Sequence, residues 1–145
     1  MKTMSLKNRI YSMLMFALVI ISFPACESDY VTPELTLKEE LIGTWDITSY
    51  KLNGEEYIPN LLKSGLIQFS PFTGLKGEFT QEVTFPDEES LTLTGEYEVD
   101  EENNEVRIEY EGDIITAEIE ITGGNMMNWE SVRDEYPLIL KANKR

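Results

Sequence analysis

The side chains that most often carry enzyme chemistry are scarce in this chain of 145 residues. The chain has no histidine and a single cysteine, Cys26, so it offers no imidazole for acid–base catalysis or zinc binding. One cysteine also excludes an internal disulfide. The sequence contains neither a Gly-x-Ser-x-Gly element nor a glycine-rich phosphate-binding loop. We therefore expect a protein that is not an enzyme, with no catalytic residue, no metal site and no cofactor.

Carboxylates, by contrast, are abundant, since residues 26–145 contain 27 acids and 9 bases. Two carboxylates suffice for glycoside hydrolysis, but nearly all of these acids occupy outward-facing strand positions or turns. Residues 100–104 (DEENN) resemble the start of a calcium loop, yet Glu105 stands where an EF-hand requires glycine. A solvated acidic surface is the preferred interpretation. Such a surface also argues against nucleic acid as a partner, because phosphate contacts need Lys and Arg.

The N-terminal segment has the order of an export signal. Residues 1–9 are basic, and residues 10–23 form an uncharged, mostly apolar run that is shorter than the roughly 20 residues needed to span a bilayer. Pro24 and Ala25 follow the run, so that a small residue stands immediately before Cys26. This order resembles the signal of bacterial lipoproteins, although Phe23 and Pro24 depart from its commonest pattern. The alternative is an ordinary secretory signal followed by a spare cysteine.

The lipoprotein resemblance implies a signal peptide over residues 1–25, cleavage before Cys26 and acylation of the Cys26 thiol with chains such as palmitate. Two or more acyl chains make a stable membrane anchor. Residues 26–37 then form an acidic tether. Its start, Glu27-Ser28-Asp29, resembles a signal that sends lipoproteins to the outer leaflet in certain Gram-negative lineages. We expect a cell-envelope protein anchored to the outer membrane through Cys26, with surface exposure as the further expectation.

Residues 38–145 read as one β domain, because apolar and polar residues alternate in many short runs. In residues 91–99, for example, Leu91, Leu93, Tyr97 and Val99 alternate with Thr and Glu. Such alternation predicts antiparallel strands with one buried face. Residues 55–64 are expected to form a longer link with one or two helical turns near Leu61. The predicted strands are 41–52, 65–70, 76–85, 90–100, 105–111, 114–122, 126–132 and 137–141.

Short turns between these strands indicate that sequence neighbours pair in space. Eight strands with one charged face favour an all-β, eight-stranded antiparallel up-and-down barrel, because closure removes the sheet edges. A two-sheet β-sandwich is the alternative. The segment 41–50, with Gly43-Thr44-Trp45, resembles the first strand of lipocalin-like domains, whose hallmark is Gly-x-Trp. The resemblance covers about residues 39–142, but the family's threonine–aspartate–tyrosine motif is missing.

The lipocalin resemblance implies that Trp45 is a structural plug at the closed end of the barrel. In that family an arginine from a late strand covers this tryptophan. Arg133 is expected at the opposite end, where the seventh strand finishes, so we expect the Lys141 region to supply the cation.

Any ligand would enter the inward face of the barrel. Gly95 and Ala117 would leave room there, whereas the many large inward side chains favour a filled core. We expect a lipid-anchored barrel that binds a small apolar ligand or none. The alternative is a structural or protein-interaction lipoprotein with a filled core, an acidic surface and an unidentified protein partner. The candidate ligand-binding residues are Phe69, Phe79, Tyr97, Tyr110, Met127 and Trp129.

Overall fold

The computed structural model describes residues 34–145, which form one compact unit. The predicted signal peptide, the lipidated Cys26 and most of the tether lie outside the described residues. Within residues 34–145, no helix is both long and apolar enough to cross a membrane.

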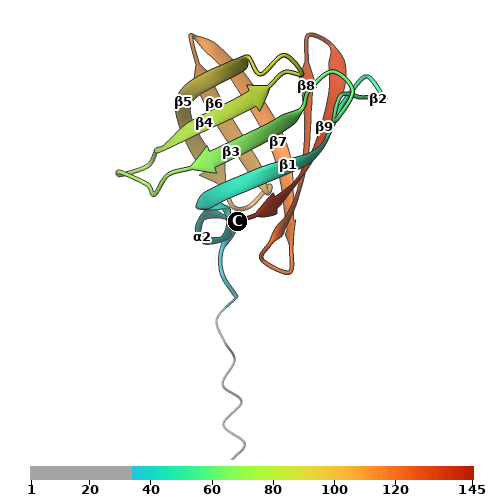
Figure 1. Ribbon diagram of the computed structural model, residues 1–145. Helices are drawn as coiled ribbons and strands as arrows, with labels where there is room; N and C mark the ends of the chain where they lie inside the picture. The colour runs from blue at the N-terminus through green and yellow to red at the C-terminus, as the bar shows by residue number, and fades with distance from the viewer. Residues whose placement is uncertain (1–33) are drawn as a thin grey trace, which may run out of the picture. The chain divides into compact units, whose positions relative to one another are not determined.

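The sheet is an antiparallel meander that closes on itself (Figure 1). Strands β1, β3, β4, β5, β6, β7, β8 and β9 each pair with the next, and β1 pairs with β9 from Trp45–Lys144 to Leu52–Leu138. The two-residue strand β2 is an extra hairpin partner of β1. The predicted eight-stranded barrel is confirmed, and the β-sandwich alternative is wrong. The elements of the described residues are α2 (Leu37–Leu41), β1 (Gly43–Leu52), β2 (Glu55–Glu56), β3 (Ser64–Phe69), β4 (Gly77–Thr84), β5 (Ser90–Asp100), β6 (Glu105–Tyr110), β7 (Asp113–Thr122), β8 (Met126–Arg133) and β9 (Tyr136–Lys144).

Alternation in the sequence becomes burial in the barrel. In β6, Val106 and Ile108 are buried while Arg107 and Glu109 between and beside them are exposed. Each predicted strand matches an observed one closely, except that β9 continues three residues beyond Lys141 to Lys144. The period-two pattern therefore placed both the strands and their inward faces.

A short helix that the sequence analysis did not anticipate covers one end of the barrel. Helix α2 begins with a capping box: the Thr36 side chain accepts from the Glu39 backbone N, and the Glu39 side chain accepts from the Thr36 N. Leu37 and Leu41 are buried in the core. The prediction that places Leu37 in the tether and Leu41 in the first strand is wrong, because both residues belong to α2. The reason is packing, because the two leucines lie on one helical face and cover the end of the barrel.

The long link between β1 and β3 also differs from expectation. It contains β2 and a single turn in which the Tyr57 carbonyl accepts from the backbone N of Leu61 (2.7 Å) and of Leu62 (2.8 Å). Residues 57–63 form no regular helix, so the predicted helical turns near Leu61 are reduced to this one turn. Leu62 is buried and ties the link to the core.

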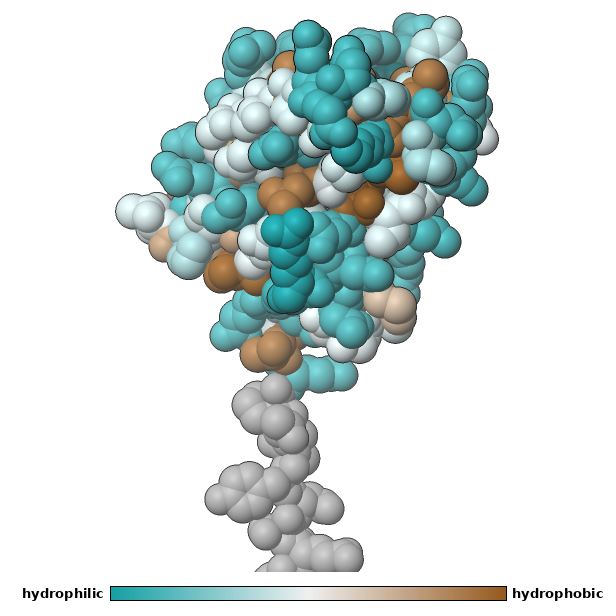
Figure 2. Space-filling model, in the orientation of Figure 1, coloured by the Kyte–Doolittle hydropathy of each residue, from teal (hydrophilic) through white to brown (hydrophobic). Residues whose placement is uncertain are grey.

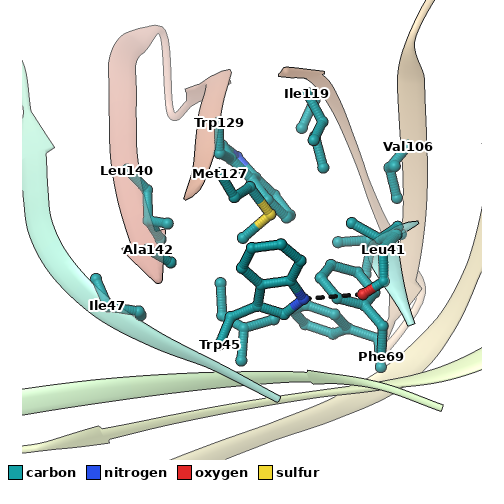
Figure 3. Close-up of a cluster of buried hydrophobic side chains, with 14 of the residues drawn as sticks. Leu41, Trp45, Ile47, Phe69, Val106, Ile119, Met127, Trp129, Leu140 and Ala142 are labelled. Carbon is teal, nitrogen blue, oxygen red and sulfur yellow. Dashed lines mark hydrogen bonds between the residues drawn. The ribbon is translucent and has the colours of Figure 1, made fainter. Parts of the chain in front are cut away.

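Trp45 lies at the end of the barrel that α2 covers, fully buried among apolar side chains (Figure 3). Its indole Nε1 donates to the Leu41 carbonyl over 2.8 Å. The cation over the ring is Lys144, whose Nζ lies 5.2 Å from the ring centroid and donates to the Glu40 carbonyl over 2.6 Å. The expectation of Lys141 is wrong, because the longer β9 places Lys144 opposite Trp45 and Lys141 opposite Ser49. We call this the closed end.

The half of the barrel next to the closed end is filled by its own side chains. Phe69 and Tyr97 are buried there with ring centroids 4.9 Å apart. Gly95 does not leave room, because a Cβ added to it would lie 2.3 Å from the Glu109 carbonyl oxygen. Ala117 is also fully buried. The expected space at Gly95 and Ala117 is therefore occupied, since the neighbouring strand crosses closely at the glycine.

Tyr97 makes the stability of this half sensitive to alkaline pH. Its hydroxyl donates to the Ser70 carbonyl over 2.7 Å, and burial raises the pKa of Tyr97 to about 12. Because the folded pKa lies above the unfolded value, the stabilisation is complete below the unfolded pKa and is lost as pH rises through the folded one. We expect the free energy of unfolding to fall by roughly 2 kcal/mol more in the wild type than in Tyr97→Phe between pH 10 and 12. Urea unfolding at several pH values measures this, and equal slopes would contradict it.

Candidate ligand-binding site

The opposite end of the barrel holds an open, largely apolar cavity, which we call the mouth cavity. It lies where β1 finishes and where β4 turns into β5, with the β1–β3 link forming one wall. Its volume is about 470 Å³, within the range of roughly 300–1,000 Å³ that is usual for small-molecule sites. The lining residues are Tyr50, Leu52, Tyr57, Leu61, Leu62, Gln81, Val83, Phe85, Leu91, Leu93 and Arg133.

Glu56 holds the link in place beside the mouth cavity. Its carboxylate accepts from the Ser49 hydroxyl (2.5 Å), from the Tyr50 backbone N (2.8 Å) and from the Ile58 backbone N (3.2 Å). Burial acts to raise the pKa of Glu56, but these hydrogen bonds and the charge of Lys51 together lower it. The carboxylate therefore stays ionised near neutral pH and fixes the link against β1, which gives the mouth cavity a preformed wall.

A much smaller space continues from the mouth cavity toward the closed end. Its volume is about 20 Å³, enough for about one water molecule. The two cavities share four lining residues, which mark the floor of the mouth cavity: Tyr50, Gln81, Leu93 and Arg133. The half of the barrel toward the closed end is therefore filled by side chains, apart from this small space. The half toward the mouth contains an open pocket.

Arg133 is the last residue of β8 and lies away from Trp45, as predicted; the residue is exposed to solvent, and it also lines both cavities at this floor. Its Nη1 donates to the Tyr50 hydroxyl over 3.4 Å. Partial desolvation acts to lower the pKa of Arg133, but Tyr50, Tyr110 and Asp134 outweigh it and raise the pKa. The guanidinium is therefore a permanent positive charge at the boundary between the two cavities.

The surface around the mouth cavity carries exposed apolar side chains. Leu61 and Leu91 line the mouth cavity and are each 49% exposed, and Ile114, Val132 and Tyr136 are exposed at strand ends of the same side. Figure 2 shows one face of the molecule, on which apolar side chains interrupt a mostly hydrophilic surface. An exposed apolar lining on an acidic domain is typical of a site that another apolar group covers.

The lining of the mouth cavity has apolar walls and a few polar groups. It combines apolar walls with the phenols of Tyr50 and Tyr57, the amide of Gln81 and the guanidinium of Arg133. Over residues 34–145, no cluster of three or more His, Cys, Asp or Glu side chains is placed to hold a metal ion. This composition suits recognition of a small molecule by burial of apolar surface and a few polar contacts.

The structure separates the six predicted ligand-binding residues into two groups. Phe79, Tyr110 and Trp129 line the small space below the mouth cavity. Phe69, Tyr97 and Met127 are buried nearer the closed end and line neither the mouth cavity nor that space. A role for any of the six in ligand contact stays a prediction.

Three lining residues outside the six candidates share a sequence signal. Phe85, Leu91 and Leu93 are predicted inward positions close to the turn at residues 86–89, so strand parity and distance from the turn place them at one end of the barrel. Tyr57, like the other link residues, shows no alternation, and no sequence signal pointed to it.

Comparison with known proteins bears on the fold alone. No protein-family model and no curated protein sequence matches this chain. Among solved structures, the redesigned β-barrel b11L5F_LGL aligns with a TM-score of 0.59 and 13% identity over 76% of this chain and 96% of its own. A second redesigned barrel, mFAP1 bound to DFHBI, aligns with a TM-score of 0.54 and 16% identity. This alignment covers 77% of this chain and 100% of mFAP1. Lobster apocrustacyanin A1 aligns with a TM-score of 0.51 and 17% identity. This alignment covers 73% of this chain and 61% of the apocrustacyanin chain.

The fold is a lipocalin-like barrel. The similarity spans designed and natural proteins at identities of 13–17%, so it reflects the closed eight-stranded meander and not shared site residues. In this lipocalin-like barrel, the Gly-x-Trp tryptophan occupies the closed end, and the mouth cavity opens at the other.

Proposed function

We propose that this protein is a lipid-anchored cell-envelope protein whose lipocalin-like barrel binds a small apolar ligand in the mouth cavity. The observation that carries the proposal is the cavity of about 470 Å³ with apolar walls, set above a filled barrel. A ligand seated there would cover leucine side chains that are half exposed to water without it. Removing apolar surface from water contributes about 25 cal/mol per Å².

A structural neighbour supports the use of such a barrel as a binding module. The redesigned barrel mFAP1, which matches over its whole length, is bound to the small molecule DFHBI. By analogy of fold alone, an eight-stranded barrel of this size has room for one small ligand at its open end.

The place where the chain enters the barrel supports the anchoring part of the proposal. Glu34, the first residue of the described unit, leads into α2 at the closed end, and it follows Cys26 by 34 − 26 = 8 residues. Eight residues span at most about 28 Å. An anchor on Cys26 would hold the closed end near the membrane and leave the mouth cavity free to take its ligand from the aqueous side.

The alternative is an interaction or structural lipoprotein. The filled half of the barrel and the excess of acids over bases in residues 26–145 favour it. The two functions differ in one property, because only the first requires the mouth cavity to exchange water for a small molecule.

Binding of a neutral apolar fluorophore tests the proposal. We expect the full chain carrying Cys26→Ser, purified without detergent, to bind N-phenyl-1-naphthylamine with a rise in fluorescence. Leu91→Asp places a charge in the mouth cavity and should weaken the binding at least tenfold. Thr92→Asp, on the outward face of the same strand, should leave it unchanged. No fluorescence rise in the parent, or equal binding by both variants, would overturn the proposal in favour of the interaction lipoprotein.

A further inference from the structure

The lining of the two cavities has an unusual charge. Arg133 is the one charged side chain among the residues that line either cavity, and every other lining residue is apolar, aromatic or an uncharged amide. This is unexpected in a domain where acids outnumber bases by 27 to 9 over residues 26–145. The acids lie on the outside of the barrel and in turns, so the only fixed charge facing the cavity is positive.

The guanidinium of Arg133 has donors to spare. It carries five N–H groups, and its hydrogen bond to Tyr50 is long, at 3.4 Å. None of the ion pairs found within residues 34–145 involves Arg133, whereas Arg107 pairs with Glu98 and Arg145 with Asp46. Arginine presents two parallel N–H groups that match the two oxygens of a carboxylate.

The polar groups and the apolar walls of the site are arranged in sequence along the barrel axis. Arg133, Tyr50 and Gln81 stand at the floor, where the mouth cavity meets the small space below. Above them, the link and the β4–β5 hairpin contribute apolar walls, including Leu61, Leu91 and Phe85. The floor therefore suits a polar head and the walls suit an apolar chain.

We propose that the mouth cavity selects a single-chain amphiphile with a carboxylate head, which Arg133 pairs at the floor while the chain lies against the apolar walls. This inference rests on the proposed binding function and specifies its ligand class. Tyr50 and Gln81 supply further hydrogen bonds to the head. Arg133 is thus a specificity-determining residue.

The surroundings of the mouth cavity limit the ligand to one negative charge. The turns at this end carry Asp87, Glu89, Glu111 and Glu135, all exposed. These acids repel an anion in their field, whereas Arg133, which is itself exposed to solvent on one side, attracts a head that reaches the boundary between the two cavities. A polyanion such as a nucleotide would meet more repulsion at the rim than one guanidinium offsets.

Three probes with the same ten-carbon chain separate this inference from the function on which it rests. Decanoate, decanol and decyltrimethylammonium, each below its critical micelle concentration, compete with N-phenyl-1-naphthylamine for the Cys26→Ser chain. We expect decanoate to displace the fluorophore at a concentration at least tenfold lower than decanol, and the cation to be the weakest. If the fluorophore binds and the three probes displace it equally, or the cation binds best, the carboxylate inference is overturned while cavity binding stands. If the fluorophore does not bind at all, the proposed function itself fails.

Substitutions of Arg133 test whether this residue causes the preference for decanoate over decanol. Arg133→Gln should bring decanoate to the level of decanol, with the neutral fluorophore still bound as the control for folding. Arg133→Lys should restore part of the preference. Arg107→Gln, which removes an outward-facing arginine of the same charge, should leave the preference unchanged. An equal loss in Arg107→Gln and Arg133→Gln would mean attraction by overall charge and would overturn the assignment to Arg133.

Discussion

Trp45→Ala is expected to lower the free energy of unfolding by about 3–5 kcal/mol, as for other large buried aromatic side chains. Trp45 is fully buried at the closed end, and its indole N–H satisfies the Leu41 carbonyl at the C-terminal end of α2. Removing the ring leaves a cavity beneath α2 and an unpaired carbonyl at the end of the helix. Urea unfolding followed by circular dichroism measures the loss.

Milder variants keep this prediction testable if Trp45→Ala does not fold. Trp45→Phe retains most of the packing but removes the hydrogen bond to Leu41, so it should cost about 1–2 kcal/mol. Leu75→Ala, at a position that is 84% exposed, should change the stability by less than about 0.5 kcal/mol. If Trp45→Ala kept its stability but no longer bound the naphthylamine fluorophore, Trp45 would be a ligand contact and not a plug.

Cys26→Ser is expected to release the protein from membranes of a host that processes lipoproteins. Each buried methylene of an acyl chain contributes about 0.8 kcal/mol, so losing two long chains removes on the order of 10 kcal/mol or more of anchoring free energy. The protein should move from the membrane to the soluble fraction and stop incorporating a labelled palmitate analogue. Fractionation and labelling in the same cells measure both effects.

The control for this experiment keeps the cysteine and changes its neighbour. Glu27→Gln alters the acidic start of the tether but not the acylated residue, so total membrane association and labelling should persist. Membrane association of Cys26→Ser together with continued labelling would contradict acylation at this residue and favour an ordinary secretory signal.

The strands and their buried faces could be read from the sequence because a strand's side-chain period of two is a local property. Val106 and Ile108 are buried, and Arg107 between them is exposed, as their alternation predicts. The same parity, counted along eight strands joined by short turns, placed Arg133 at the end away from Trp45. Local alternation and short turns left little freedom for any other sheet order.

Helix α2 and the position of the lysine over Trp45 depend on contacts between segments that are far apart in the sequence, so only the tertiary structure decided them. Helix α2 is five residues long, too short to be stable alone, and forms because Leu37 and Leu41 bury themselves on the barrel. Whether Lys141 or Lys144 would lie over Trp45 depended on how far β9 continued along β1, a pairing about 100 residues apart in sequence.

The division between a filled and an open half was likewise beyond sequence reasoning. Gly95 looked like space in the sequence, but the close crossing of Glu109 occupies it. The mouth cavity exists because a link without periodic sequence is held against β1 by Glu56. The sequence by itself determined the barrel, since one residue's face follows from its neighbours. Only the tertiary structure decided the cavity and the isolated charge of Arg133, since empty volume depends on how side chains from several strands and the link fill the same space.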